Sequence, residues 1–489
     1  MIEGPSVQNS VVPRTLCLAL TSSLFLLGTA CGENPRSQTA ETKAISGKRP
    51  AAEYEETKAL ITASGWLRLF EFEAKKSGQS QAQQDETANR VREYSNLLTV
   101  ILKSQPSLKI FFHTPERVSD ELGDQSEYAR WAPQVEAWKK NGFNIDFLRM
   151  DPKNFPGVDQ EDLEEDQWTR DYGSFSVIND GDVSEIARKG RGQYVNTVVA
   201  DNLKRDIEIV DSYYEGGQFM ATSTGVCASS SSGYSINAEN FKSFDNTSQQ
   251  INYQENLIFK SLGCRRILKM PGLPNEGTGH IDLFAKFMDD RTVLLADYTD
   301  DDVLLEGVST EVDNICDAKS IENKDWSSCA SSGNWRDVII NQGSVLRIKS
   351  ENELRDFVAK NQGITEFEYA HGQLHEHLEK ALVLFQSEGF DVVRVTNPTP
   401  TIRLGVMIYR DSSGAIVHRN AELNFTHRSY TNSLVSNGYL YLPTYQTSPA
   451  LNAAASSTYE ALGLKVQNID MSETIKTGGA VHCLTKDLH

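Results

Sequence analysis

Long hydrophobic runs are almost absent from this sequence of 489 residues. The longest, residues 16–28 (LCLALTSSLFLLG), has 13 residues, whereas a membrane-spanning helix needs about 20. The mean hydropathy of the chain is −0.43. These features exclude a polytopic membrane protein.

Basic residues are also scarce relative to acidic ones. The 48 Lys and Arg residues stand against 67 Asp and Glu residues, which gives a formal net charge of −19. Because nucleic-acid phosphates need clustered Lys and Arg, this balance argues against nucleic acid as a main partner. It is compatible with a small cationic substrate, and also with ordinary solubility charge. Six Trp, 17 Tyr and 20 Phe residues exclude a disordered acidic chain.

The N-terminal region has the pattern of an export signal. Residues 16–28 suit the hydrophobic part of a signal peptide. Small residues before Cys31 resemble a bacterial lipoprotein cleavage site, so we expect residues 1–31 to be a lipoprotein-type signal peptide, with membrane attachment through a lipid on Cys31. Simple secretion after cleavage near Ala30 is the alternative. Residues 32–52 are then a flexible polar tether, and residues 53–489 form a single catalytic domain.

Cysteine is sparse, and its placement suggests two disulfides and one free thiol. Cys316 and Cys329 are close in the sequence, and Cys227 and Cys264 bracket a serine-rich stretch. An exported chain permits both pairs, although the sequence leaves the connectivity open. Cys483 is then left without a disulfide partner, and it is either an incidental residue or a reactive thiol.

Hydrophobic periodicity predicts an α/β chain. Residues 85–104 show the periodicity of a helix, with Val91, Tyr94, Leu97, Leu98 and Ile101 on one face. Further helices are expected at 132–141, at 374–388 and from 456 to 463. Strands are expected at 108–113, 143–150, 265–270, 390–396, 437–445 and 464–470. Helix followed by strand recurs about five times. Two stretches, roughly 220–256 and 298–345, interrupt this order and are expected to be loop insertions.

Four short segments carry residues suited to chemistry. They are Trp168-Thr-Arg170-Asp171-Tyr-Gly173, Glu215-Gly-Gly217, Gly279-His280-Ile-Asp282 and Gly478-Gly479-Ala-Val-His482-Cys483. Each segment alone is more often structural than catalytic, since Gly-Gly pairs and Arg-Asp pairs are common in turns. Their order along one chain is the informative feature.

In this order, the segments resemble the guanidine-modifying (pentein) superfamily, and within it the agmatine deiminase and bacterial-type peptidylarginine deiminase family. The segment RSYTN at 428–432, followed by NGYLYLP, resembles another segment of that family. The resemblance covers about residues 90 to 489 and implies a five-bladed α/β propeller of ββαβ units around a central active site. The five helix–strand repeats agree with that fold.

The resemblance also implies roles for individual residues. Asp171 and Asp282 would hold the guanidinium by bidentate charge-assisted hydrogen bonds, which suits its planar, forked shape. Cys483 would attack its central carbon as a thiolate, and His280 would protonate the leaving amine and later activate water. Glu215 would orient His280. Asn432 matches a family residue that lines the substrate pocket. Trp168 is a further candidate for substrate binding, by stacking on the substrate, with a core role as the alternative. No metal and no cofactor is needed for this scheme.

Some residues near these segments admit other interpretations. His482 is adjacent to Cys483, but neighbouring residues of a strand point to opposite faces, so we expect it to support the site rather than act as base. Arg170 is expected to form a structural ion pair. The acidic stretches 159–166 and 297–302 either ring the pocket entrance or are solvated loops. Clustered acids also suit calcium, but the EF-hand spacing is absent and no metal site is predicted.

The sequence departs from the family in ways that leave the substrate open. No Trp-Pro opening is evident near residues 53–75, Gln218 follows Glu-Gly-Gly, and the Arg pair that binds a substrate carboxylate cannot be placed, since Arg188 and Arg191 are only neighbours. We therefore expect a deiminase acting on agmatine, an arginine derivative or a peptidyl arginine. The alternatives are an amidinotransferase on the same scaffold and a non-catalytic binding lipoprotein.

Overall fold

The computed structural model describes most of the chain beyond the N-terminal segment. The described residues are 47–76, 81–115, 126–150, 155, 158, 166–211, 215–230, 257–274, 276, 278–298, 305–315, 317–323, 330–336, 373–413 and 416–489. The predicted signal peptide, the lipid on Cys31 and the Cys316–Cys329 pair lie outside these residues and stay predictions. Within the described residues, no helix combines the length and the apolar character that crossing a membrane requires.

Four sheets repeat one pattern. An antiparallel hairpin is followed by a helical segment and then by a strand that runs parallel to the second hairpin strand. The strands of these sheets are β5 (Phe175–Asn179), β6 (Asp182–Arg188) and β7 (Ile207–Val210); β8 (Phe219–Ala221), β9 (Val226–Ser230) and β10 (Arg266–Met270); β11 (Ala285–Phe287), β12 (Thr292–Tyr298) and β15 (Asp391–Asn397); and β18 (Leu434–Ser436), β19 (Tyr439–Thr444) and β20 (Lys465–Asp470).

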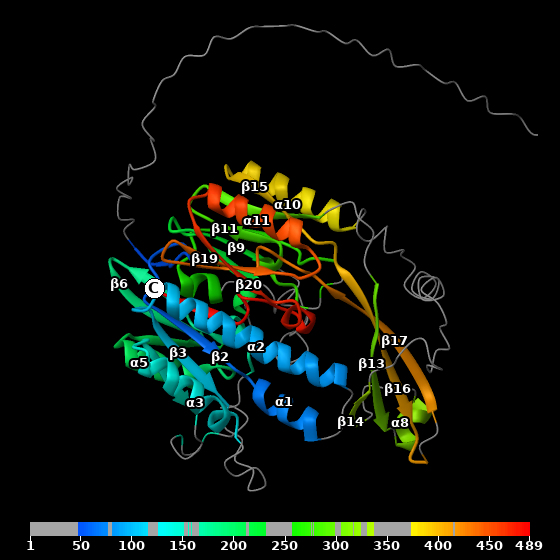
Figure 1. Cartoon of the computed structure of the whole chain (residues 1–489). Coiled ribbons are helices and arrows are strands. Elements are labelled where there is room, and N and C mark those ends of the chain that lie inside the picture. The colour runs from blue at the N-terminus through cyan, green and yellow to red at the C-terminus, as the bar shows by residue number, and fades with distance from the viewer. Residues whose placement is uncertain are drawn as a thin grey trace, which may run out of the picture. The chain divides into compact units, whose positions relative to one another are not determined.

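The fifth sheet joins the two ends of the domain. The last strand, β21 (Thr485–Leu488), pairs antiparallel with β2 (Ala59–Ala63), which pairs in parallel with β3 (Lys109–Thr114). A further strand, β4 (Ile145–Arg149), pairs with β3. β21 therefore supplies the first strand of this unit, although it is last in the sequence. Five ββαβ units result, and the predicted α/β propeller of the pentein type is confirmed (Figure 1).

The helices connect the hairpins to their parallel strands. They are α1 (Leu67–Lys76) and α2 (Gln81–Ser104) before β3, α3 (Glu127–Lys140) before β4, α5 (Gln193–Leu203) before β7, the helical residues 257–262 before β10, α10 (His375–Ser387) before β15 and α11 (Pro449–Ala461) before β20. The predicted helix ends agree best where a local signal marks them. Gly389, for example, follows α10 with a φ of +86°, the left-handed conformation that ends helices.

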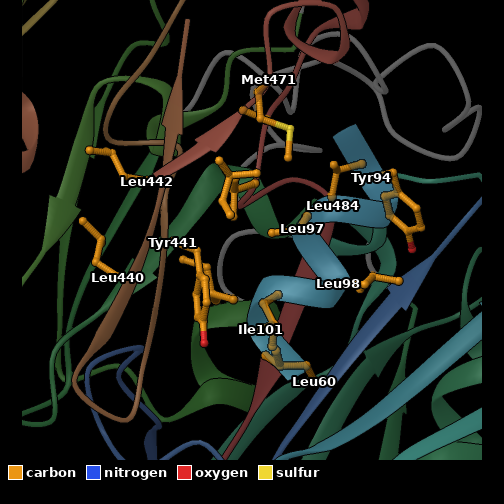
Figure 2. Close-up of a cluster of buried hydrophobic side chains, with 14 of the residues drawn as sticks. Leu60, Tyr94, Leu97, Leu98, Ile101, Leu440, Tyr441, Leu442, Met471 and Leu484 are labelled. Carbon is orange, nitrogen blue, oxygen red and sulfur yellow. The ribbon is translucent and has the colours of Figure 1, made fainter. Parts of the chain in front are cut away.

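The largest hydrophobic core lies against α2. Tyr94, Leu97, Leu98 and Ile101 are spaced three and four residues apart, and each is at most 1% exposed. They pack in one cluster with side chains of β2, β19 and the segment before β21, among them Leu60, Leu440, Leu442 and Leu484 (Figure 2). Each fully buried Leu contributes about 1.5–3 kcal/mol relative to an exposed one. This core joins the sheet that contains β2 and β21 to the sheet that contains β19. It also fixes the segment that carries Cys483.

The predicted insertions are only partly loops. Residues 219–230 contain β8 and β9, so the expectation of a loop insertion beginning near 220 is wrong there. These short strands lack a clear alternating pattern and are held by pairing with each other and, for β9, with β10. Within 298–345, β13 (Leu305–Ile315), α8 (Ala318–Asn323) and β14 (Ala330–Arg336) form regular structure. β13 pairs with β16 (Thr401–Arg410), and β16 with β17 (Ile416–Thr426), giving an additional sheet (Figure 1).

The predicted tether also ends earlier than expected. Residues 49 and 50 form β1 (Arg49–Pro50), which pairs with β5, and Ala52 is fully buried. The boundary at residue 52 is therefore wrong, because the polar composition of this stretch does not reveal backbone pairing with a strand more than 120 residues away. Of the two candidate disulfides, Cys227–Cys264 is present, next to the β9–β10 pairing. Cys483 is a free, buried thiol.

Candidate active site

The predicted site residues occupy equivalent places in the five repeated sheets. Each lies in the segment that leads into the first strand of a hairpin, and these segments contact one another. They are Asp171 in α4 (Thr169–Tyr172) before β5, Glu215 at the start of η4 (Gly216–Gln218) before β8, His280 and Asp282 at the start of and within η6 (Ile281–Leu283) before β11, Asn432 before β18, and Cys483 before β21. The repeat of the fold thereby brings residues from five distant segments to one place.

Cys483 is buried and held by Asn432. Asn432 Nδ2 donates to Cys483 Sγ at 3.1 Å, while Asn432 Oδ1 accepts the backbone N–H of Ala480 at 2.9 Å. Asp282 Oδ2 lies 3.7 Å from the sulfur. Burial raises the pKa of Cys483 to about 12, with a further rise from the charge of Asp282 and an opposing hydrogen bond with His280. The thiol therefore needs an additional positive charge nearby to ionise at neutral pH.

His280 lies between two carboxylates and the thiol. Its Nε2 is 3.0 Å from Glu215 Oε2, and its Nδ1 is 3.9 Å from Asp171 Oδ1. Burial lowers the pKa of His280, but Asp171, the hydrogen bond with Cys483 and the hydrogen bond with Glu215 raise it, and the result lies well above the ordinary value. His280 is therefore placed to carry a proton beside the sulfur, as a general acid requires.

Asp171 and Asp282 are the two carboxylates that face this space. Among the described residues, Oδ1 of Asp171 and Oδ1 of Asp282 are buried without a hydrogen-bond partner. Burial raises the pKa of Asp171 to about 7, against the opposing charge of His280. The pKa of Asp282 is lowered, because His482 outweighs the effect of burial. Two buried acceptor oxygens beside a thiol suit a cation with several N–H donors, and a guanidinium has this form.

Two glycines of the motifs are required by close packing. A Cβ at Gly217 would lie 2.3 Å from His280 Nδ1, and one at Gly479 would lie 2.8 Å from both Cys483 Sγ and the ring of Trp168. Contacts this short do not occur in folded proteins, so the side chains of His280 and Cys483 lie where they do only beside glycine. The same packing puts Trp168 next to Cys483, and the Trp168 ring also contacts the main core.

His482 supports Asp282, and the sequence did not reveal the two residues behind it. His482 Nδ1 is 2.6 Å from Asp282 Oδ2, and its Nε2 is 2.8 Å from Glu53 Oε2. Both carboxylate oxygens of Glu53 accept from Lys286 Nζ at 2.8 Å. His482 therefore contacts Asp282, as expected of a supporting residue. Glu53 and Lys286 lie in no recognisable motif, and no local signal marks either of them.

The two arginines near the motifs form ion pairs. Arg170 Nη1 lies 2.7 Å from Asp487 Oδ1, with both side chains about 4% exposed, so Arg170 has the structural pairing expected of it. Arg191 contacts Glu215 Oε1 at 3.1 Å and Asp166 Oδ2 at 2.7 Å. Arg191 therefore joins the segment before α4 to the carboxylate that contacts His280, a role that the sequence did not indicate.

Metal binding finds only weak support in this geometry. Possible ligand atoms of His280, Asp282 and Cys483, and likewise of Asp171, Glu215 and His280, lie within 4.8 Å of one another. Cys483 Sγ and His280 Nε2 already take part in the hydrogen bonds above, and we assign neither set as a metal site. Of the acidic stretches, residues 159–165 and 299–302 lie outside the described residues, while Asp166 is taken up by Arg191.

Comparison with known proteins agrees with this description. The family model of the Porphyromonas-type peptidyl-arginine deiminase matches residues 357–488, which include Asn432 and Cys483. No curated protein matches the chain significantly in sequence.

Solved structures extend the likeness to most of the chain. The C. jejuni agmatine deiminase with substrate bound matches with a TM-score of 0.52 at 15% identity, over 90% of this chain and 96% of that chain. A candidate arginine deiminase from Porphyromonas gingivalis matches with a TM-score of 0.50 at 15% identity, over 90% and 98%. At this identity the likeness shows a shared fold. Together with the family model it supports the predicted resemblance: residues 357–488 are similar to the Porphyromonas-type peptidyl-arginine deiminase family, and the chain shares the fold of the agmatine deiminases.

Proposed function

We propose that this protein is a deiminase that hydrolyses the guanidinium group of a small cation or of a peptidyl arginine to a ureido group and ammonia. The observation that carries the proposal is the buried thiol of Cys483 beside two carboxylates, Asp171 and Asp282, each with an oxygen that lacks a donor. The related solved structures include agmatine deiminases, which supports the same class of reaction.

Substrate binding prepares the nucleophile in this scheme. The guanidinium donates its N–H groups to Oδ1 of Asp171 and Oδ1 of Asp282, which places its central carbon near Cys483 Sγ. Its positive charge offsets the carboxylates that hold the thiol protonated, so the pKa of Cys483 falls when the substrate enters. The thiol is therefore reactive mainly in the presence of the cation that it attacks.

Proton transfers fall to His280. As the cation binds, Cys483 releases its proton to solvent. The thiolate forms a bond to the guanidinium carbon, and the tetrahedral intermediate expels one amine, which leaves as ammonia with the proton of His280. A thiouronium remains on Cys483. His280, now neutral, takes a proton from water as the water attacks the same carbon. The C–S bond then breaks, the hydroxyl proton of the intermediate passes to the departing sulfur, and the ureido product leaves with Cys483 again a thiol. Glu215 keeps the His280 ring in place through the 3.0 Å contact at Nε2.

The test is a screen of agmatine, free arginine and an arginine-containing peptide for ammonia and ureido product. We expect release with at least one of them, and Cys483→Ser to lose at least about a thousandfold in rate, because no other described group can take the place of the thiolate. Lys476→Gln is the control: Lys476 pairs only with nearby Glu473 and precedes the same segment.

The outcomes separate the alternatives. A new guanidine formed from an added acceptor amine, in place of a ureido compound, would indicate an amidinotransferase. A protein that binds guanidines but neither hydrolyses them nor transfers their amidino group would be a binding protein. Either result would overturn the proposed hydrolysis.

A further inference from the structure

His482 is enclosed by carboxylates on both sides of its ring. Its Nδ1 contacts Asp282 Oδ2 at 2.6 Å, and its Nε2 contacts Glu53 Oε2 at 2.8 Å. The side chains of His482 and Asp282 are 4% and 3% exposed, and that of Glu53 is 16% exposed. Both distances are those of strong charge-assisted hydrogen bonds.

The two contacts fix the ring between ionised carboxylates. The pKa values of Asp282 and Glu53 are both lowered, because His482 and Arg170, with His280 for Asp282 and Lys286 for Glu53, outweigh the effect of burial. Both ring nitrogens of His482 are therefore engaged with carboxylate oxygens, and neither is open to a further contact with Cys483.

Glu53 is itself held from two other strands. Lys286 Nζ of β11 donates to both of its oxygens at 2.8 Å, and the backbone N–H of Val435 in β18 donates to Oε1 at 3.0 Å. The Lys286 side chain is 3% exposed. A carboxylate fixed by three donors from separate elements provides a rigid support for the ring that it contacts.

We propose that Glu53 is a positioning residue for the guanidinium site, acting through His482 on Asp282. By holding the ring at Nε2, Glu53 keeps Nδ1 of His482 on Oδ2 of Asp282 and leaves Oδ1 of Asp282 as the oxygen that faces the substrate. This inference rests on the proposed deiminase function, since it assigns Glu53 a part in binding the cation.

Other charged groups surround His482. Arg170 Nε donates to the His482 backbone carbonyl at 3.3 Å, and Arg170 pairs with Asp487. These two residues, together with Lys486 and Lys286, line the same cavity as His482. Because this set holds three basic residues and one acidic residue, Glu53 and Asp282 supply the further negative charge that balances the cavity.

The first experiment measures the ring itself. In protein labelled with ¹⁵N-histidine, the His482 signal is assigned by its loss in His482→Gln. In Glu53→Gln we expect the chemical shifts of both ring nitrogens of His482 to change, because the contact at Nε2 is altered and the ring is no longer held from two sides. Unchanged shifts of both ring nitrogens would overturn the proposal.

The second experiment measures substrate turnover. Glu53→Gln keeps the size and a hydrogen-bonding group but removes the charge. We expect kcat/KM to fall by about 10- to 100-fold, mainly through a higher KM. This is the usual effect of removing a residue that orients a substrate-binding group without touching the substrate. Glu55→Gln is the matched control, because Glu55 lies two residues away and pairs with Arg49, away from His482. Unchanged KM in Glu53→Gln would contradict the proposal.

A labelling experiment separates this inference from the proposed function. Cys483 is alkylated either with the cationic reagent 2-chloroacetamidine or with its neutral analogue 2-chloroacetamide. If the unmodified protein shows no preference for the cation, the guanidinium site itself fails. If it shows the preference and Glu53→Gln keeps it in full, the cation site stands and the positioning role of Glu53 is wrong. Loss of the preference in Glu53→Gln, with the neutral rate retained, supports both.

Discussion

Two histidines lie next to the same thiol, and each is placed between two carboxylates. His482 is held at 2.6 Å and 2.8 Å by Asp282 and Glu53. His280 is held at 3.0 Å by Glu215 but lies 3.9 Å from Asp171, beyond hydrogen-bond distance. One ring is fully engaged, whereas the other keeps one nitrogen without a short carboxylate contact. The difference in contacts indicates which ring can exchange a proton during a reaction.

The basic residues that contact Glu53 and Glu215 differ in their exposure to solvent. Lys286, behind Glu53, is 3% exposed, whereas Arg191, behind Glu215, is 27% exposed. Solvent screens the charge of Arg191 and permits its movement, so the His280 side is electrostatically softer. A proton carrier benefits from such surroundings, since its charge changes during turnover, while a support for a binding carboxylate benefits from a fixed charge.

The largest effect is expected from removing the histidine that exchanges protons. His280→Asn should reduce kcat by about 10²- to 10⁴-fold, the usual contribution of a general acid–base residue. His482→Asn should chiefly raise KM. His375→Asn, at an exposed position of α10, should leave kcat and KM unchanged. Steady-state kinetics with the best guanidine substrate measures all three. A greater kcat loss in His482→Asn than in His280→Asn would reverse the comparison.

The second prediction concerns Asp171 and Asp282, the two carboxylates that face the proposed substrate. Because burial raises the pKa of Asp171 to about 7, its carboxyl is neutral below that pH and no longer attracts a cation. Asp282, whose pKa is lowered, stays ionised. We expect kcat/KM to fall about tenfold per pH unit as the pH drops below 7, as for one essential deprotonated group.

The pH profile is measured between pH 5.5 and 8.5 with a substrate whose charge is constant over that range. Asp171→Asn should bind substrate weakly at every pH and should lack this acidic limb. An acidic limb that survives in Asp171→Asn would show that another group titrates.

The smallest effect is expected at the exposed cation. Arg191→Met removes ion pairs that are partly screened and contribute at most about 1 kcal/mol, so kcat should fall by no more than about fivefold. Lys189→Met, at an exposed residue 3.9 Å from Asp211, is the control. Lys286→Met should cost more, since Lys286 is buried against Glu53. Equal losses in Arg191→Met and Lys286→Met would contradict the difference between the two sides.

Local sequence patterns predicted the elements that depend on local contacts. The helix at 85–104 was recognisable because its buried residues recur with helical spacing, and α2 buries that face. The short strands β8 and β9 were not recognised, because their pairing with each other and that of β9 with β10, rather than their own residue pattern, stabilise them. β1 was missed for the same reason: two residues in a polar stretch become a strand only by pairing with β5.

The candidate site was predicted to the extent that its residues lie in motifs. Asp171, Glu215, His280, Asp282, Asn432 and Cys483 come together in the structure, and the motif glycines Gly217 and Gly479 are explained by contacts with His280 and Cys483. Glu53 was not predicted, because its hydrogen bond joins it to His482, 429 positions away, and no spacing rule relates the two.

The sequence by itself determined the residue types available for chemistry and, through hydrophobic periodicity, the repeated helix–strand order. Only the tertiary structure shows which histidine contacts a carboxylate through both ring nitrogens, which carboxylate oxygens of the described residues lack a donor, and that Cys227 and Cys264 form a disulfide. These properties depend on burial and on distances of a few ångströms between segments that are far apart in the chain, and a linear pattern contains neither.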